Sequence, residues 1–232
     1  FKNKTIKKIE KINGYGNSRL YKMINTDGKH NTIKYYPDQM LDPRPRLQTE
    51  FYALKFLHAK KITNIPKALR KYEDLNIGVY EWIKGCTFQK PQIQDLNQAI
   101  DFIEKLNALS REKNIKDINL ASEACLSAID LIEQIEQRLT KLKKLKKQYP
   151  KLKIFLDQRF DPLWKKIKKE CFYQWPISSR KKSLSNDKQI LSPSDFGFHN
   201  ALKNKGKITF IDFEYFGWDD PVKLTADFIW HP

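Results

Sequence analysis

The spacing of apolar residues changes along this chain, and the change limits the folds that are open to it. Short runs of strand-like composition come first, at 19–24, 31–36, 66–72 and 77–83. A helix is expected among them at 46–60. Later apolar residues recur every three or four positions, which predicts amphipathic helices at 94–110, at 120–147 and from Pro150 to about residue 170. Strands that precede helices predict an α+β chain with two lobes, at 1–83 and 84–232.

Two tight turns are also expected. Asp27-Gly28 lies between the first two strand runs, and this pair favours a hairpin because both residues tolerate positive φ. A second turn is expected at 203–206, which ends in Gly206. It would fold 207–212 back antiparallel to 200–202.

The polar residues at the open end of this second hairpin form the strongest candidate site. Asn200 begins one strand and Asp212 ends the other, so antiparallel pairing brings them to the same end, with Asp195 in the loop beside them. Phosphoryl transfer needs a carboxylate near the attacking hydroxyl and oxygen ligands for Mg²⁺. The three residues can supply both, although a surface hairpin with turn-forming Asp and Asn would give the same pattern.

A lysine and a glutamate in the first lobe form a second candidate site. Glu50 lies three residues after Leu47 and four before Leu54, so it shares the apolar face of its helix. A carboxylate there is costly unless it is paired. Lys34 lies in the middle of a strand and is the expected partner. One interpretation is that the pair holds the lysine over nucleotide phosphates. The other is an ion pair at the edge of the core that binds no ligand.

Two weaker patterns accompany these sites. Gly14 and Gly16 precede the first strand run, where glycines let backbone N–H groups approach phosphates or simply mark an ordinary turn. The strand that contains Glu81, Trp82 and Ile83 leads to Gly85 at the lobe boundary. Its backbone could meet the edge of an adenine, or it is a plain core strand.

Together and in this order, the patterns resemble the aminoglycoside phosphotransferase and choline kinase families. Their catalytic loop reads His-Gly-Asp-x-x-x-x-Asn and their metal-binding strand Ile-Asp-(Trp/Phe)-Glu. This chain has Pro193-Ser194-Asp195 with Asn200, then Ile211-Asp212-Phe213-Glu214. The stretch from Gly217 to Asp227 is similar to the family's Gly-Asp-Pro…Asp-Leu-Ala. The resemblance covers nearly the whole chain and is sharpest at 190–228.

The resemblance implies a protein-kinase-like bilobal fold, with a small antiparallel sheet in the N-lobe and a mainly helical C-lobe. It also implies that the γ-phosphate of Mg²⁺-bound ATP moves to a hydroxyl of a small molecule. Asp195 would activate that hydroxyl, and Asn200 and Asp212 would hold Mg²⁺. Lys34, braced by Glu50, would contact the phosphates. The glycine segment would cover the phosphates, and residues 81–83 would carry the adenine.

Two departures from the family pattern bear on these roles. Pro193 replaces the histidine that usually braces the catalytic loop, which puts the geometry of that loop in question. The chain also stops at Pro232, soon after Asp227, whereas family members continue with helices that help to bind the acceptor. We therefore expect part of the acceptor site to lie outside this sequence.

Charge and composition bear on the partners of the chain. Lys and Arg number 44 against 27 Asp and Glu, so the formal net charge of the 232 residues is +17. This charge indicates either a polyanionic partner or simply a solvated, lysine-rich surface. The lysine-rich region 141–153 has few aromatics for base stacking, which argues against nucleic acid. The sequence contains no run of about 18 apolar residues, so no membrane span is expected. The three cysteines are odd in number and widely spaced, which favours reduced thiols in a cytoplasm over a disulfide framework.

Three readings follow from these patterns. The first is an active small-molecule kinase in the cytoplasm, without a membrane partner. The second is a non-catalytic kinase-like module that binds nucleotide or a partner, and the third is a nucleic-acid binder. The acceptor stays open, because the net charge favours an anion whereas the acidic segment 212–227 suits an amino-sugar or amino-alcohol. The oligomeric state is open too. No Ala-Pro-Glu follows Asp212, so we expect no peptide platform of the protein-kinase kind.

Overall fold

The computed structural model describes residues 6–12, 18–40, 42–112, 115 and 117–230. The chain forms two compact units, one made of 1–124 with 189–232 and the other of 125–188. Each unit is described by itself below. The expected lobe boundary at 83/84 falls within the first unit and stays a prediction.

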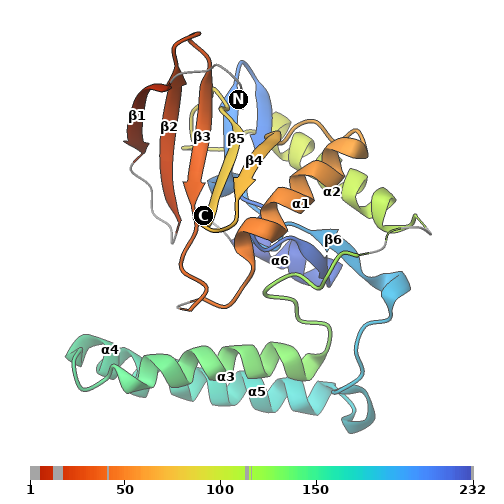
Figure 1. Ribbon diagram of the computed structural model, residues 1–232. Coiled ribbons are helices and arrows are strands. Elements are labelled where there is room, and N and C mark those ends of the chain that lie inside the picture. The colour runs from red at the N-terminus through yellow and green to blue at the C-terminus, as the bar shows by residue number, and fades with distance from the viewer. Residues whose placement is uncertain (1–5, 13–17, 41, 113–114, 116, 231–232) are drawn as a thin grey trace. The chain divides into compact units, whose positions relative to one another are not determined.

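A five-stranded antiparallel sheet dominates the first unit (Figure 1), in the order β1-β2-β3-β5-β4. Its strands are β1 (Ile6–Ile12), β2 (Arg19–Asn25), β3 (His30–Tyr35), β4 (Ala68–Tyr72) and β5 (Ile77–Glu81). The expected hairpin joins β2 to β3, where Gly28 has φ 76° and its N–H donates to Asn25 O over 3.0 Å. The edge strand β1 was not predicted, because its isoleucines lie among lysines without a regular alternation, and Ile6 and Ile9 are half exposed.

Two helices, α1 against the sheet and α2 against β6 (Ile190–Ser192), build the core of this unit. The helix α1 (Arg46–Ala59) packs against β4 and β5 and buries Leu47, Leu54 and Leu57. The helix α2 (Ile93–Ser110) begins with a capping box, in which the Asp95 carboxylate accepts from Gln92 N over 2.9 Å. Both helices match their expected ranges within one residue.

The C-terminal part of the first unit adds two short strand pairs and a helix. Strand β6 (Ile190–Ser192) pairs with β9 (Gly217–Asp219), and β7 (Ala201–Asn204) pairs with β8 (Lys207–Phe210). Lys205 and Gly206 have φ of 48° and 80°, so the turn is centred on these two residues within the expected hairpin. Phe198–Asn200 is a single 3₁₀ turn, and α6 (Pro221–Trp230) ends the described chain.

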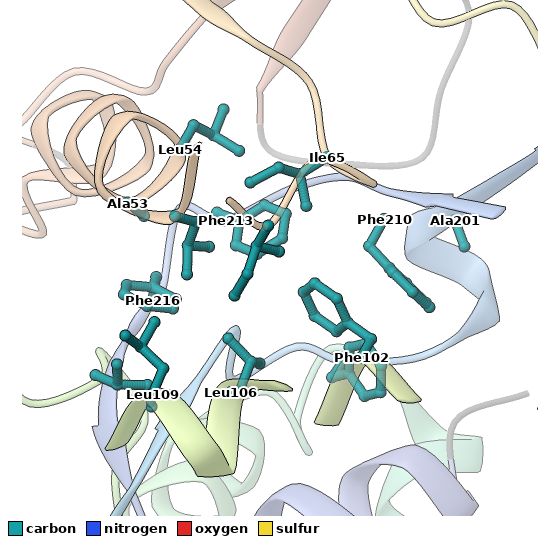
Figure 2. Packing of buried hydrophobic residues seen from close by; sticks show 14 of the residues in the cluster. Ala53, Leu54, Ile65, Phe102, Leu106, Leu109, Ala201, Phe210, Phe213 and Phe216 are labelled. Carbon is teal, nitrogen blue, oxygen red and sulfur yellow. The ribbon is translucent and has the colours of Figure 1, made fainter. Parts of the chain in front are cut away.

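The core of this unit is rich in phenylalanine (Figure 2). The ring of Phe102 from α2 lies 4.6 Å from Phe210, 5.6 Å from Phe196 and 6.3 Å from Phe213, measured between ring centroids. Phe102 and Phe213 are fully buried, and Leu54 from α1 belongs to the same cluster. The core therefore ties α2 to the segment that contains Asp212.

The second unit is a helical hairpin of α3 (Ala128–Lys144) and α5 (Asp161–Gln174). The short α4 (Pro150–Phe155) and a π turn at Leu156–Phe160 join them, and 3₁₀ turns follow at Ile177–Ser179 and Asn186–Lys188. The unit has its own small core of Ile132, Leu139, Leu156 and Trp164. The helix expected at 120–147 begins later, because Ser127 caps it by accepting from Asp130 N over 3.2 Å.

Two arginines anchor the segment before α1. Arg44 donates to Asp42 over 2.7 and 2.8 Å and to Glu123 over 2.7 Å. Arg46 also binds Asp42, and both guanidinium groups lie 4.9 Å from the centre of the Tyr215 ring. Asp42 therefore holds two arginines against the loop that follows Asp212.

Within the described residues, no helix combines the length and the apolar character that crossing a bilayer would require.

We expect Phe102→Ala to lower the free energy of unfolding by about 3–5 kcal/mol, because it leaves a cavity among three other rings. The exposed Ile100→Ala on the same helix is the control and should cost less than about 1 kcal/mol. Urea denaturation followed by circular dichroism measures both. Equal losses for the two variants would contradict this description of the core.

We expect Asp42→Asn to lower stability at pH 7 by about 1–2 kcal/mol, because it weakens charge-assisted hydrogen bonds. The Arg44 hydrogen bond holds the pKa of Asp42 below its usual value, although burial opposes this. A depressed folded-state pKa gives stability that is present above about pH 4 and is lost as the pH falls. The stability gap between wild type and Asp42→Asn should therefore shrink towards about pH 3. A gap that stays constant with pH, or an equal loss for the exposed control Asp101→Asn, would refute this.

Candidate active site

A buried lysine lies at the centre of the candidate site. Lys34 in β3 is 5% exposed, and its Nζ lies 2.7 Å from Glu50 Oε2, 2.8 Å from Asp212 Oδ1 and 2.9 Å from Glu214 Oε2. The two acids at 212 and 214 come from the loop after β8, and Glu50 comes from α1. One ammonium therefore joins the sheet, the helix and the C-terminal part of the unit.

Glu50 is held by two further groups besides the lysine. Its Oε2 accepts from the Tyr36 hydroxyl over 2.6 Å, and its Oε1 accepts from the Phe213 N–H over 3.3 Å. The Tyr36 and Tyr80 hydroxyls lie 2.7 Å apart. Gly78, the partner of Lys34 on β5, leaves room for this network, because a Cβ there would lie 2.4 Å from the Tyr80 hydroxyl. The pairing of Lys34 with Glu50 expected from the helix face is present.

The electrostatics of the cluster keep Lys34 charged. Burial disfavours the ammonium, but the carboxylates of Asp212, Glu50 and Glu214 outweigh it and raise the pKa of Lys34 well above its usual value. Burial raises the pKa of Glu50, and Lys34 partly offsets that effect. Burial and the Glu50 charge also raise the pKa of Tyr36, which keeps the hydroxyl available as a donor.

Asp212 is the member of the cluster that reaches the surface. Its side chain is 36% exposed, against 8% for Glu214 and 6% for Glu50. Its φ of 67° lies in the left-handed region, which is uncommon for a residue other than glycine and is often found at functional sites. This conformation occurs between Ile211, whose N–H donates to Asn200 O over 2.9 Å, and the buried ring of Phe213.

The loop from Asp195 to Asn200 lies at the open end of the β7–β8 hairpin. The Asn200 side-chain amide donates to Asp195 O over 2.9 Å and to Asp195 Oδ2 over 3.1 Å. His199 Nε2 lies 3.1 Å from Asp195 Oδ1. Asp195 is thus held by a histidine that follows it in sequence, whereas the resembled families place theirs two residues before it.

The residues expected to carry an adenine lie at the end of β5. Glu81 O accepts from Thr32 Oγ1 over 3.4 Å, and Lys22 Nζ lies 5.0 Å from the centre of the Trp82 ring. An open pocket of about 690 Å³ adjoins Glu81 and Trp82 but is not lined by Ile83 or Lys34. Gly14 and Gly16 lie outside the described residues.

Three residues of this region were not predicted from the sequence as parts of the site. Glu214 accepts from Ser18 Oγ over 3.1 Å and forms an ion pair with Arg46. His199 contacts Asp195. The signal for Glu214 was its place two residues after Asp212 in the run Ile211-Asp212-Phe213-Glu214. No local pattern marks Arg46, which is a buried residue of the first turn of α1.

The donor set suits a hard divalent cation. One carboxylate oxygen from each of Glu50, Asp212 and Glu214 lies within 4.8 Å of the others, around the Lys34 ammonium that pairs with all three, and Asp212 is the most exposed of them. Asn200 directs its amide nitrogen to Asp195, and its amide oxygen has no hydrogen bond from the described residues. Carboxylate and amide oxygens are the ligands that Mg²⁺ prefers. The sequence-based choice of Asn200 and Asp212 is chemically compatible with such a site.

No protein-family model and no curated protein sequence matches the chain. Several solved structures have a similar fold. A choline kinase from Cryptosporidium parvum Iowa II is 16% identical, with 95% of this chain and 62% of that chain covered and a TM-score of 0.61. Amicoumacin kinase hAmiN in complex with AMP-PNP, Ca²⁺ and Ami is 15% identical, with 98% and 63% covered and a TM-score of 0.58.

A thermostable mutant of an aminoglycoside phosphotransferase, in ternary complex with ADP and hygromycin B, is 13% identical, with 96% and 72% covered and a TM-score of 0.52. The chain therefore spans 62% to 72% of the length of these three proteins. The five-stranded sheet and the helices around it give the chain the fold of the choline kinase and aminoglycoside phosphotransferase group, which confirms the α+β, protein-kinase-like architecture expected from its sequence.

Proposed function

We propose that this chain transfers the γ-phosphate of Mg²⁺-bound ATP to a hydroxyl group of a small molecule. The observation that carries the proposal is the contact of buried Lys34 with both Glu50 and Asp212. An ammonium held in this way presents a fixed positive charge beside an aspartate that is open to solvent. Two of the similar proteins were solved with AMP-PNP or ADP, which supports ATP as the phosphate donor.

Each residue has a proposed part in the reaction. Lys34 binds the α- and β-phosphates, and Glu50 keeps it in place. Asp195 accepts the proton of the acceptor hydroxyl, whose oxygen forms the new bond to the γ-phosphorus while the bond to the β–γ bridging oxygen breaks and ADP leaves. Asn200 and Asp212 would hold Mg²⁺, which neutralises phosphate charge when bound. Glu81, Trp82 and Ile83 meet the adenine.

The acidic segment 212–227 gives less support to a cationic acceptor than its composition indicates. Lys223 Nζ lies 2.7 Å from Asp227 and 3.4 Å from Asp219. Asp220 accepts from the Val222 N–H at the start of α6 over 2.7 Å. Three of the five acids therefore have structural partners, and Asp212 and Glu214 belong to the Lys34 cluster. A panel of acceptor molecules for activity assays should accordingly include neutral sugars beside choline, ethanolamine and hygromycin B.

A non-catalytic module that binds nucleotide is the second candidate. Pro193 favours it, because the resembled families have a histidine at this place in the catalytic loop. The contact between His199 and Asp195 argues for the enzyme instead, since it gives the aspartate another brace. Binding of Mg·ATP without turnover on the whole acceptor panel would favour the module.

We expect Lys34→Ala to weaken Mg·ATP binding at least about tenfold, because a charged contact to phosphate is lost. Isothermal titration calorimetry measures the affinity, and circular dichroism checks the fold. Lys34→Arg tests whether the position of the charge matters, and the exposed Lys105→Ala is the control. An unchanged affinity in a folded Lys34→Ala would remove Lys34 from the nucleotide site.

We expect Asp195→Asn to lower kcat by about 10²–10⁴-fold with nucleotide binding kept, because the proton acceptor is lost. Asp212→Asn should instead abolish the Mg²⁺ dependence of ATP binding. Release of ADP with the acceptor panel and calorimetry with and without Mg²⁺ measure the two effects, with exposed Asp74→Asn as control. Near-wild-type turnover by Asp195→Asn would exclude its role, and efficient transfer to peptides alone would exclude a small-molecule acceptor.

A further inference from the structure

The positive charge of the chain is concentrated in the helical hairpin of residues 125–188. This unit contains 17 Lys and Arg against 7 Asp and Glu, which is +10 of the chain's formal +17. Its length is 64 of the 232 residues. None of the residues proposed for phosphate transfer lies in this unit, so its charge calls for a separate explanation.

The charge gathers at one end of the hairpin. We define the hairpin tip as residues 142–155, which comprise the end of α3, the connecting turn and α4. In Figure 1 the tip lies at the opposite end of the hairpin from the points where the chain enters α3 and leaves α5. Lys143 and Lys146 pair with Asp161 and Asp157. Four more lysines of the tip are exposed and have no ion pair within the described part of the chain, namely Lys144, Lys147, Lys151 and Lys153.

The same tip also exposes large apolar side chains. Tyr149 and Ile154 are each 56% exposed, Phe155 is 48% exposed, and Leu142 and Leu145 are 42% and 40% exposed. Leu142 lies in the last turn of α3, Leu145 is its C-cap residue, and Tyr149 is the N-cap residue of α4. The small core of the unit buries Leu139 and Leu156, which flank these residues, and of the tip only Leu152 packs against it. Apolar side chains among unpaired lysines are costly in water and need a partner.

The composition of the tip selects among anionic partners. Interfacial helices combine lysines on a polar face with Leu, Phe and Trp on the other, and bind anionic lipid through both. Nucleic acid would use the lysines and stack bases on Tyr149 and Phe155, but it would leave the leucines and Ile154 in water. An interfacial segment lies in the plane of the membrane surface, so it does not need a spanning helix.

We propose that the hairpin tip docks the protein on an anionic lipid surface. The four unpaired lysines contact the lipid headgroups, and Leu145, Tyr149, Ile154 and Phe155 enter the boundary between headgroups and acyl chains. This surface differs from the expectation, drawn from the sequence, that the chain has no membrane partner. The proposal is independent of the phosphotransferase activity, because no residue of the Lys34 cluster or of the loop 195–200 takes part.

Vesicle co-sedimentation of the full chain tests the proposal. We expect binding to phosphatidylcholine vesicles with about 30% phosphatidylserine, and at least tenfold weaker binding to phosphatidylcholine alone. The charge variant replaces the four unpaired tip lysines by Gln. The matched control removes the same charge from exposed lysines of the other unit, with Lys7, Lys55, Lys90 and Lys105 changed to Gln. The charge variant should lose at least tenfold in binding, and the control should keep wild-type binding.

An apolar variant separates docking from simple charge attraction. This variant combines Tyr149→Ser, Ile154→Ser and Phe155→Ser, and it should bind vesicles at least tenfold more weakly at unchanged net charge. If the triple variant loses helicity, Tyr149→Ser alone takes its place in the test. Three results would overturn the proposal: equal loss in the charge variant and its matched control, wild-type binding by the apolar variant, or binding of single-stranded RNA without binding of vesicles.

Discussion

The site depends on one buried positive charge. Lys34 is almost inaccessible to water, and burial of its ammonium would be prohibitive without the carboxylates of Glu50, Asp212 and Glu214 around it. Because these groups come from a strand, a helix and a distant loop, the charge balance requires that all three segments meet. Arg46 adds a second cation on the far oxygen of Glu214. Removal of Lys34 would leave the buried Glu50 carboxylate without the ammonium that pairs with it.

The apolar core makes this meeting of charges possible. Phe213 lies between Asp212 and Glu214 in sequence, and its ring is fully buried against Phe102 while its N–H donates to Glu50. The two acids on either side are thereby directed to Lys34. The left-handed φ of Asp212 is accommodated in this short segment because the ring and the hydrogen bonds on both sides fix the backbone.

The helical hairpin of residues 125–188 follows a different physical logic. Its two main helices share only a small core, so most of their surface is exposed and carries lysines. Net charge calculated over the whole sequence does not show this concentration, because it combines the +10 of these 64 residues with the +7 of the other 168. Only the division of the chain into two units shows where the charge lies and which apolar side chains accompany it.

The sequence by itself determined the elements with strong local signals. The Asp27-Gly28 hairpin, the stripes of α1 and α2, and the pairing of Glu50 with a lysine followed from φ preferences, helical period and the cost of a lone carboxylate. The proximity of Asp195 to Asn200 followed from the short loop. The contacts of His199 with Asp195 and of Lys223 with Asp219 and Asp227 each span four residues and are local. Tertiary structure alone decided that Arg46 pairs with Glu214 and that Glu214 in turn pairs with Lys34. These contacts depend on which distant surfaces pack together, and no local period or propensity encodes that choice.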